Sequence, residues 1–522
     1  MDLMDKLVSL AKRRGFIFPS SEIYGGLNGA WDYGPLGAEL KRNIKQAWWD
    51  DMISHHDELE AVSGTPSPYA MVGLDSALLM NPKVWEASGH VGGFNDPMVD
   101  DRETKARYRA DQLVVFGLKF TDKDGSSETL DDPLYASPGE AGKTDPAELI
   151  APHRKRIQKI QKSRRPAEEE MTIVPIADAL SDDALRAKTL SPQASAPGSL
   201  TPPRAFNLMF KTHVGAMEDN SSVAYLRPET AQGIFVNFKN VIDTSRVKLP
   251  FGIGQIGKAF RNEINPRNFI FRSREFEQME IEFFCRPDEA PAWYDYWVKR
   301  RYQWYLDLGI AKDRLVLREH EADELAHYAQ GCADVEYKFP FGQSELEGIA
   351  NRADFDLRQH MEASGKDLRY FDDQATDPDA KRFLPYVIEP SAGADRATLA
   401  FLCDAYTEDE VGGEQRTVLK LHPRLAPFKA AIFPLVKKEG MPEKARAIAA
   451  TLRKRFNVMY DEKGAIGRRY RRQDEAGTPF CITVDGDSLA NDSVTVRERD
   501  GCTQERVAAD RLPDYLADQI EA

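Results

Sequence analysis

The sequence predicts an α+β protein with an inserted module and a small C-terminal α/β domain. Residues 258–284 form two extended segments around a loop, and their apolar and charged side chains alternate with the two-residue period of a strand. Residues 112–204 interrupt this pattern with charged runs and a linker rich in Ser and Pro. From about residue 412, short apolar strands alternate with helical segments, which is typical of an α/β domain.

Composition indicates a soluble folded chain. The chain has 522 residues and a net charge of -14, and 42% of its residues are hydrophobic, which suggests roughly three domains. No apolar run approaches the roughly 18 to 20 residues of a membrane helix, and the first residues do not resemble a secretory signal. The negative charge argues against a general nucleic-acid coat protein, but it allows a local basic patch to bind one RNA.

The cysteines predict a reducing, cytoplasmic location. They number five and contain no C-x-x-C pair, so neither a disulfide framework nor a cysteine zinc site is indicated. Each is most simply a small buried apolar side chain. They are Cys285, Cys332, Cys403, Cys481 and Cys502.

The N-terminal elements follow from local patterns. The first 16 residues predict an amphipathic helix, and a segment dense in Gly and aromatic residues then predicts tight turns. Residues 37–53 have helical spacing. The apolar run at 73–82, which ends in Pro82, predicts a strand.

The hairpin at 258–284 carries charge on a strand that also has an apolar face. Cations on such a strand face suit the binding of a polyphosphate, carboxylates suit an ammonium group, and an aromatic ring can stack on a purine. A solvated hairpin with cross-strand ion pairs accounts for the same pattern. One face carries Phe276, Gln278, Glu280 and Glu282, and the other carries Glu277, Met279, Ile281 and Phe283.

Several motifs resemble one enzyme family. FRNEI at 260–264 and FRSREFEQMEIEFF at 271–284 resemble motif 2 of class II aminoacyl-tRNA synthetases, in the form found in the dimeric glycyl enzymes. YGPLG, RPETAQGIF and EPSAGADR agree with the glycyl pattern in chain order, and the helix at 37–53 with the strand at 73–82 resembles motif 1. The resemblance covers most of residues 1–110 and 205–522.

The resemblance implies four regions and one reaction. A catalytic domain, an antiparallel sheet flanked by helices, spans 1–111 with motif 1 and 205–411 with motifs 2 and 3. An inserted module spans 112–204, and an anticodon-binding domain spans 412–522. Such an enzyme activates glycine with ATP and Mg²⁺ to glycyl-adenylate, transfers the glycyl group to the 3′ end of tRNA(Gly), releases AMP and diphosphate, and forms a homodimer without contacting a membrane. Many bacterial relatives have a C-x-x-C pair before residue 107, where this chain has DDRETKAR, so no zinc is expected.

The resemblance also implies an ATP site. Arg261 would hold the α-phosphate and Arg396 the γ-phosphate, and these two residues are the expected catalytic pair. Glu263 would read the adenine amine, Phe276 would stack on the ring, and Glu345 would contact Mg²⁺, although Glu345 also fits a surface turn. The expected ATP-binding residues are Arg261, Asn262, Glu263, Phe271, Arg272, Phe276, Glu345, Leu346, Gly393, Ala394, Asp395 and Arg396.

A glycine site follows from the same resemblance. Glu229 would bind the substrate ammonium, although a carboxylate at a helix start is also an ordinary cap. Glu280 and Glu389 would crowd the pocket, and a closed pocket rejects every larger side chain by overlap. Ala392 stands where relatives often have Phe. The expected glycine-binding residues are Arg109, Glu229, Phe276, Glu277, Gln278, Met279, Glu280, Glu389, Pro390, Ser391 and Gly393.

The RNA contacts and two rival functions stay open at this stage. The basic run at 153–165 is either a solvated helix face or a contact to an acceptor stem, and Arg468, Arg469, Arg471 and Arg472 are either a solvated helix or tRNA-binding residues. A synthetase for proline, threonine or histidine would share the motifs, but not all three glycyl segments together. A non-catalytic relative, such as the accessory subunit of a mitochondrial DNA polymerase, would typically lack the phosphate arginines that this chain retains.

Overall fold

The computed structural model describes residues 2–122, 133–139, 144–161, 164–219, 221–321, 325, 329–377, 381–438 and 440–521. The chain forms two compact units. The first unit comprises residues 1–88 and 210–522, and the second comprises residues 89–209.

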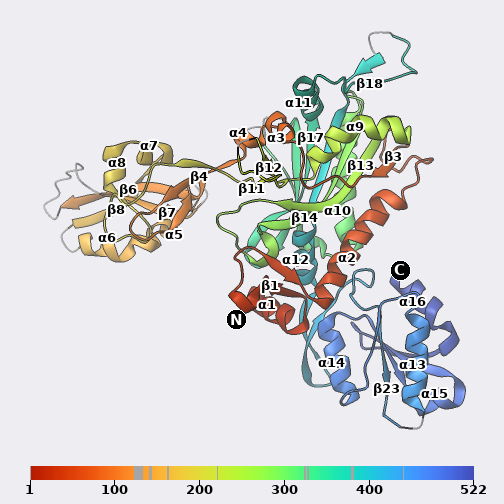
Figure 1. Ribbon diagram of the computed structural model, residues 1–522. Helices are drawn as coiled ribbons and strands as arrows, with labels where there is room; N and C mark the ends of the chain where they lie inside the picture. The colour runs from red at the N-terminus through yellow and green to blue at the C-terminus, as the bar shows by residue number, and fades with distance from the viewer. Residues whose placement is uncertain are drawn as a thin grey trace. The chain divides into compact units, whose positions relative to one another are not determined.

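A seven-stranded sheet forms the centre of the first unit (Figure 1). Its strand order is β15-β16-β17-β20-β14-β13-β3, and every neighbouring pair is antiparallel except β13 and β3. The sheet therefore confirms the predicted antiparallel architecture. Its strands are β3 (Ala70–Gly73), β13 (Phe251–Phe260), β14 (Glu275–Cys285), β15 (Leu315–Glu319), β16 (Gly331–Phe339), β17 (Gly342–Ala353) and β20 (Tyr386–Gly393).

Helices cover both faces of this sheet. On one face, side chains of α1, α2, α10 and α12 pack with Met279, Ile281 and Phe283 of β14. On the other face, α9 and α11 pack with Phe251 and Phe284. The predicted apolar face of the hairpin is thus confirmed. The helices are α1 (Leu3–Arg14), α2 (Pro35–Trp49), α9 (Ala231–Ser245), α10 (Ala290–Asp307), α11 (Phe355–Ser364) and α12 (Ala394–Ala405).

The strand predicted at 73–82 is wrong. Strand β3 ends at Gly73, and Pro82 is the first residue of helix α3 (Pro82–Ala87). The fixed φ of proline suits the first turn of a helix, and the side chain of Asn81 caps this turn by accepting a hydrogen bond from the N–H of Lys83. Pro82 therefore starts a helix where the prediction had it end a strand.

The C-terminal domain confirms the predicted α/β class. Its five strands have the order β24-β23-β25-β26-β27, and the three strands β24, β23 and β25 are parallel. Helices α13 and α16 pack against this sheet over one apolar core. The elements are β23 (Ala430–Pro434), α13 (Met441–Leu452), β24 (Val458–Tyr460), α14 (Ile466–Ala476), β25 (Phe480–Val484), α15 (Gly486–Asn491), β26 (Ser493–Glu498), β27 (Gln504–Ala508) and α16 (Leu512–Glu521).

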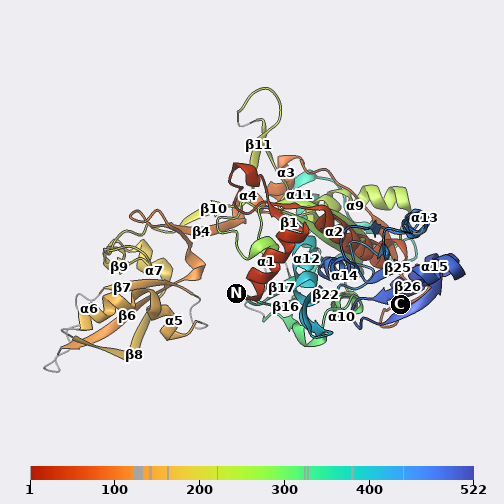
Figure 2. The ribbon, with the colours of Figure 1, turned by 90° about the horizontal axis from the view of Figure 1, so that it is seen from below.

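The second unit holds two small sheets with short helices beside them (Figure 2). One sheet has the order β8-β6-β7-β9 and the other β10-β4-β5. The unit extends beyond the predicted insertion at 112–204, because β4 pairs with both β5 and β10 across that segment. Its elements include β4 (Asn95–Asp100), β5 (Arg107–Arg109), β6 (Leu113–Asp122), β7 (Leu134–Pro138), α5 (Pro146–Ile150), α6 (Arg154–Gln161), β8 (Arg164–Val174), α7 (Ile176–Ser181), α8 (Asp183–Lys188), β9 (Thr189–Leu190) and β10 (Arg204–Asn207).

Within the described part of the chain, every helix is too short or too polar to cross a membrane. All five cysteines are free thiols, but Cys332 and Cys502 are only half-buried. Those two residues correct the expectation that each cysteine is a buried apolar side chain.

An ion pair fixes helix α10 to the sheet. Arg301 Nε lies 2.6 Å from Glu347 Oε1, and both side chains are almost fully buried. A second guanidinium nitrogen donates to the other carboxylate oxygen at 3.1 Å, and the Tyr305 hydroxyl donates to the same oxygen at 2.8 Å. The carboxylate therefore balances a cation that has no access to water.

Replacing Glu347 with glutamine should destabilise the first unit by about 3–5 kcal/mol, because it leaves the Arg301 charge buried without a counter-ion. Urea unfolding followed by the fluorescence of the α10 tryptophans measures this change. Asp243→Asn is the matched control, because it removes an exposed pair with Lys239 and should cost less than about 0.5 kcal/mol. Equal effects of the two variants would contradict the prediction.

Candidate functional site

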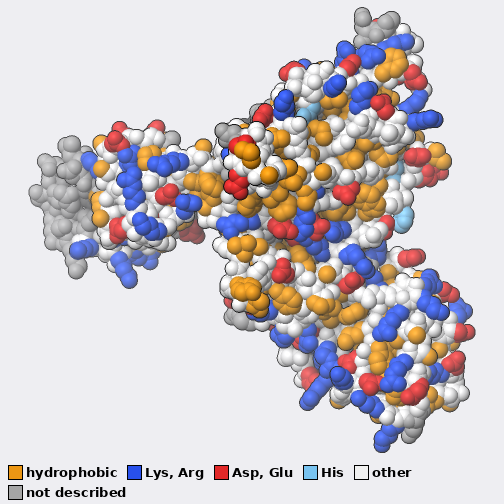
Figure 3. All heavy atoms as spheres, viewed as in Figure 1, with side chains coloured by type: hydrophobic (Ala, Val, Ile, Leu, Met, Phe, Trp, Pro, Cys, Tyr) orange, Lys and Arg blue, Asp and Glu red, His pale blue; other side chains and the backbone are white. Residues whose placement is uncertain are grey.

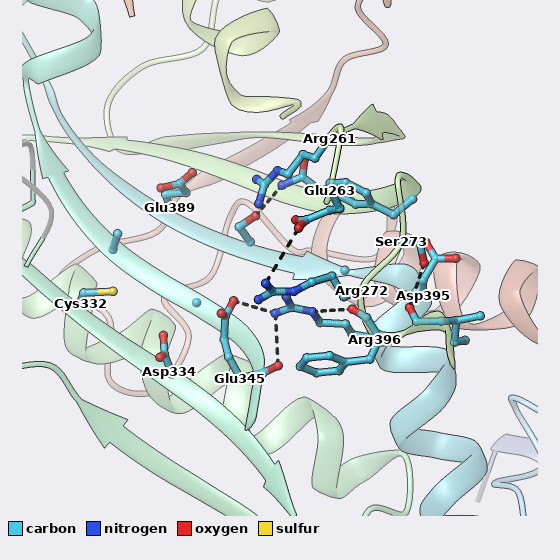
Figure 4. A pocket seen from close by; sticks show the side chains of 18 of the residues that line it. Arg261, Glu263, Arg272, Ser273, Cys332, Asp334, Glu345, Glu389, Asp395 and Arg396 are labelled. Carbon is cyan, nitrogen blue, oxygen red and sulfur yellow. Dashed lines mark hydrogen bonds and ion pairs between the residues drawn. The ribbon is translucent and has the colours of Figure 1, made fainter. Parts of the chain in front are cut away.

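A cavity of about 390 Å³ lies on one face of the seven-stranded sheet. Its floor comes from β14, β16, β17 and β20, and its rim comes from the segment 261–273 and the start of α12. Figure 4 shows arginines and carboxylates from these elements directed toward one another. A volume of this size is within the usual range for small-molecule sites.

Strand alternation selects the side chains that reach the cavity. Phe276 and Gln278 of β14 line it, and so do Glu389, Ser391 and Gly393 of β20. The register places Gln278 opposite Gly393 across the two strands. Each strand therefore contributes every second residue to the cavity and the intervening residues to the core.

A β-bulge in β17 adjusts this alternation. Glu345 pairs with Glu336, and Glu347 pairs with Val335, so Leu346 is an extra residue between the two pairs. Glu345 and Gly348 line the cavity, while Leu346 and Glu347 are buried in the core. The bulge thus brings one carboxylate into the cavity and keeps the next for the ion pair with α10.

Three arginines form the cationic side of the cavity. Arg396 lies over the ring of Phe271 at 4.5 Å and donates to the Phe271 carbonyl at 3.3 Å. Arg261 lies 5.4 Å from the centre of the Phe276 ring, and its Nε donates to the Pro228 carbonyl at 3.1 Å. Arg272 is the third, 3.9 Å from the Glu263 carboxylate. Two of them come from the segment 261–273 and the third from the start of α12, and all three line one cavity.

Glu345 is the acid closest to these cations. Its side chain is 51% exposed, and its Oε1 lies 3.1 Å from a guanidinium nitrogen of Arg396. Arg396, with smaller effects from Arg261 and Arg272, lowers the pKa of Glu345. The carboxylate is therefore ionised at neutral pH and faces the cavity from β17, and the predicted alternative of a surface turn is wrong.

Gln278, Glu389 and Ser391 line a second side of the cavity, and a group of buried carboxylates lies behind them. The predicted glycine-binding residue Glu280 belongs to this group and is not itself among the residues that line the cavity. Glu280 is 1% exposed and accepts hydrogen bonds from the hydroxyl groups of Thr230 and Ser391, the latter at 2.7 Å. Gln278 donates to the Ser391 hydroxyl at 3.3 Å. Burial and the nearby Glu229 raise the pKa of Glu280. This wall is rigid and offers acceptors to a small cation.

Two further buried glutamates lie beside Glu280. Glu389 lies 2.8 Å from Arg352, yet burial raises its pKa against the effect of that arginine. Neither carboxylate oxygen of Glu282 has a hydrogen-bond partner among the residues that the structure describes. Burial and the nearby Glu389 raise the pKa of Glu282 strongly, which favours its neutral form.

A network beneath the arginines connects distant segments. Lys41 of α2 lies 2.8 Å from Asp395 and 2.7 Å from Glu277. The Tyr33 hydroxyl donates to Asp395 at 2.5 Å, and the Glu277 backbone N–H donates to the same carboxylate at 2.7 Å. Asp395, next to Arg396, is thereby tied to both β14 and α2. These contacts fix the position of the cationic side.

The structure brings most of the predicted site residues together, but not all of them. Glu277 and Met279 face away from the cavity on β14, as does Pro390 on β20, because the strand alternation directs them to the other side. The expectation that these three side chains contact glycine is thus corrected. The side chains of Leu346 and Ala394 are buried in the core. The predicted residues that line the cavity are Arg261, Glu263, Phe271, Arg272, Phe276, Gln278, Glu345, Glu389, Ser391, Gly393, Asp395 and Arg396.

Three other predicted site residues occupy different settings. Asn262 follows Arg261 in the loop after β13, and Glu229, just before α9, accepts a hydrogen bond from Gln232 at 3.0 Å. Arg109 belongs to the second unit, where it pairs with Asp96 at 2.9 Å and with Asp111. The proposed substrate contact of Arg109 stays a prediction.

The four arginines predicted to bind tRNA differ in exposure. Arg469 is 3% exposed and donates to the carbonyls of Pro434 and Leu435, so it supports the C-terminal fold and is not available to RNA. Arg468, Arg471 and Arg472 reach the surface of α14 and keep the RNA contact as a prediction. On the face of the C-terminal domain in Figure 3, basic and acidic side chains are interspersed.

Several residues of the site were not predicted from the sequence. Arg352 pairs with both Glu389 and Asp356. Because Arg352 is four residues after Gly348 on β17, the two-residue alternation of the strand places both on the same face and could have identified Arg352. Thr230 is hydrogen-bonded to Glu280, and only the fold reveals this contact. The residues that line the cavity and were not predicted are Ile270, Ser273, His320, Ala329, Cys332, Asp334, Gly348 and Ala350.

Comparison with known proteins identifies two matching families and many similar chains. Residues 210–404 match the tRNA synthetase class II core domain (G, H, P, S and T), and residues 429–519 match the anticodon binding domain. The chain is 54% identical to a glycine–tRNA ligase of Rhodopirellula baltica, over 99% of this chain and 100% of that one. It is 50% identical to the glycine–tRNA ligase of Clostridium tetani and 48% identical to that of Thermobifida fusca, each over 99% of this chain and 98% of the other.

The network around Lys41 makes stability depend on pH. Burial alone would raise the pKa of Glu277, but Lys41 and Lys45 outweigh it and lower the pKa to about 2. A depressed pKa in the folded state contributes stability above the ordinary value near 4.5, and this contribution is lost as the pH falls toward 2. The difference in melting temperature between the wild type and Glu277→Gln should therefore be largest near neutral pH and shrink below about pH 5.

Thermal unfolding measured by circular dichroism between pH 7 and pH 3 tests this expectation. Glu275→Gln is the control on the same strand, because it removes only an exposed pair with Lys258 and should change the melting temperature little. A difference for Glu277→Gln that stays constant with pH would refute the assignment.

Proposed function

The chain belongs to the glycine–tRNA ligases of the class II synthetases, and we propose that its cavity binds ATP on the cationic side and glycine on the acidic side. The protein activates glycine and transfers it to tRNA(Gly). The observation that carries the assignment of the site is the division of one cavity between three converging arginines and a group of buried carboxylates, of which Glu389 lines the cavity and Glu280 and Glu282 lie beside it. Polyphosphate and ammonium are the two groups that such a division matches.

The cationic side has the properties of a triphosphate site. Arg261 would hold the α-phosphate and Arg396 the γ-phosphate, since both arginines line the cavity. Phe276 would support the adenine ring, and Glu263 would accept a hydrogen bond from its amine. The support for these roles is the fixed geometry of the arginines, which are held by backbone carbonyls and aromatic rings.

The acidic side has the properties of a pocket for a small ammonium. Glu280 and Glu389 would accept hydrogen bonds from the glycine ammonium, and Arg352 would balance their charge. The hydrogen bonds among Thr230, Ser391 and Glu280 hold this wall in place. A side chain on the Cα of a bound amino acid would overlap a rigid wall, whereas a site that rejects smaller substrates gains only about 1–3 kcal/mol per methylene.

The reaction then depends on position and charge. A glycine carboxylate oxygen attacks the α-phosphorus of ATP, forms a new P–O bond and displaces diphosphate; the terminal ribose hydroxyl of the tRNA then attacks the glycyl carbonyl and displaces AMP. The first step needs no general base, because the glycine carboxylate is already ionised at neutral pH. Arg261 and Arg396 would stabilise negative charge as it develops on the phosphates.

Four further features of this function stay proposals. Glu345, an ionised and half-exposed carboxylate beside Arg396, fits a Mg²⁺ site completed by substrate phosphates, and the ion would neutralise phosphate charge there. Arg468, Arg471 and Arg472 would contact tRNA(Gly). A homodimer and a cytoplasmic location follow from the family resemblance and the reduced cysteines.

The amino-acid dependence of ATP–diphosphate exchange tests the function directly. Glycine, alanine, serine, proline, threonine and histidine should be supplied separately, and only glycine should support exchange, because the carboxylate wall leaves no room for a side chain. Exchange with another amino acid would overturn the specificity. Folded protein that exchanges with none of them would be a binding protein.

The role of the arginines is tested by Arg396→Ala and Arg261→Ala. Each should lower kcat/KM for ATP in the exchange reaction by roughly 10²–10³, the size of effect that follows loss of one donor to a developing charge. Arg358→Ala is the control, since Arg358 is an exposed arginine of α11 paired with Asp354, and it should leave the rate unchanged. Near-normal exchange in either cavity variant, with the fold intact, would remove the phosphate assignment.

A further inference from the structure

Three side chains with metal-ligand chemistry lie together on the wall of the cavity. They are His320, Cys332 and Asp334, whose ligand atoms all lie within 4.8 Å of one another. His320 Nε2 is 2.7 Å from Asp334 Oδ2. All three line the same cavity as the arginines, and none of them has a part in the reaction described above.

The fold fixes these three residues in register. Cys332 and Asp334 are alternate residues of β16, so their side chains point to the same face of the sheet. His320 follows β15 directly, and its backbone N–H donates to the Cys332 carbonyl at 2.9 Å. Figure 4 shows Cys332 and Asp334 on the same wall, on the side of Glu345 and Glu389. The cluster thus rests on the rigid sheet.

The donor set is chemically selective. A thiolate, an imidazole and a carboxylate are the mixed sulfur, nitrogen and oxygen ligands that zinc prefers, whereas Mg²⁺ takes oxygen ligands. Zinc bonds of about 2.0–2.3 Å require neighbouring donor atoms to lie roughly 3.3–3.7 Å apart in a tetrahedron. The observed separations, 2.7 Å between His320 and Asp334 and at most 4.8 Å for the other pairs, lie on both sides of this range, and His320 and Asp334 would have to move apart to admit the ion.

Among the residues that the structure describes, Gly348 leaves space for a fourth ligand beside the cluster. Gly348 lies opposite Asp334 in the ladder, and a Cβ added to it would lie 3.7 Å from Asp334 Oδ1. The absence of a side chain at this position leaves space beside the cluster within the cavity. Three protein ligands with a fourth position open to a cavity are the arrangement of non-structural zinc sites, where a water molecule or a substrate group completes the tetrahedron.

We propose that His320, Cys332 and Asp334 bind one zinc-type divalent transition-metal ion on the cavity wall, with its fourth position open to the cavity. This site differs in chemistry from the Mg²⁺ site proposed at Glu345. It also departs from the expectation that the chain binds no zinc, which considered only C-x-x-C pairs.

Co²⁺ titration of the full-length, untagged protein after dialysis against a chelator tests the proposal. Binding of Co²⁺ to a thiolate produces a charge-transfer band in the near ultraviolet, and zinc should abolish this band by displacement. We expect one Co²⁺ per chain. Cys332→Ser should lose the band, and His320→Gln and Asp334→Asn should each weaken binding by more than about tenfold, the least effect that loss of even an outer-shell partner produces.

Cys502→Ser is the matched control, because Cys502 is also a half-buried thiol but lies in the C-terminal domain. It should retain the band and the stoichiometry. Circular dichroism of each variant confirms that the fold is intact. Wild-type protein that binds far less than one ion per chain, or a folded Cys332→Ser variant that keeps the band, would overturn the proposal, in which case His320 and Asp334 form a hydrogen-bonded pair only. These measurements do not use the exchange reaction, so they stand apart from the test of the ligase function.

Discussion

Charge compensation on one face of a sheet is the constraint on which the rest of this structure depends. The cavity face of β14, β17 and β20 carries carboxylates and arginines where an ordinary sheet buries apolar side chains, and an uncompensated charge there would cost several kcal/mol. The chain meets this constraint in two ways. Glu389 and Asp356 pair with Arg352, whereas burial raises the pKa of Glu282 and so favours its neutral form. The face stays polar enough to bind charged substrates, and the opposite face supplies the apolar contacts that keep it folded.

The compensation also explains why residues far apart in sequence form one site. Lys41 comes from helix α2 near the start of the chain, Glu277 from the middle of the chain and Asp395 from the start of α12, and all three share one ion-pair network. Because Asp395 precedes Arg396, the position of the arginine depends on a lysine more than 350 residues away. The ligase site is therefore assembled only when the whole first unit folds.

Much of the sheet architecture and of the candidate site could be predicted from the sequence. The two-residue alternation at 276–283 correctly separates the cavity face from the core face, and the motifs identify Arg261, Glu345 and Arg396. The predicted glycine-binding residues were wrong where a motif gave consecutive residues as a list. Glu277 and Met279 lie in the motif, but their side chains face away from the cavity. Contacts such as that between Thr230 and Glu280 depend on the packing of separate segments, which local patterns do not encode. Arg469 is buried because a long side chain can reach backbone carbonyls inside a domain, which its basic neighbours do not reveal.

The bulge at Leu346 has a consequence for how this strand tolerates change in length. Because of this one extra residue, Glu345 and Glu347 face opposite sides of the sheet. Glu345 faces the cavity, and Glu347 neutralises Arg301 on the other side. In a regular strand two residues that are two positions apart face the same side, so Glu345 and Glu347 would share a face if Leu346 joined the ladder. Loss of the bulge with Leu346 kept would therefore direct one of the two carboxylates to the wrong side of the sheet. Deletion of Leu346 would instead make the two glutamates neighbours, which still face opposite sides. The strand thus tolerates the loss of this residue better than its incorporation into the ladder.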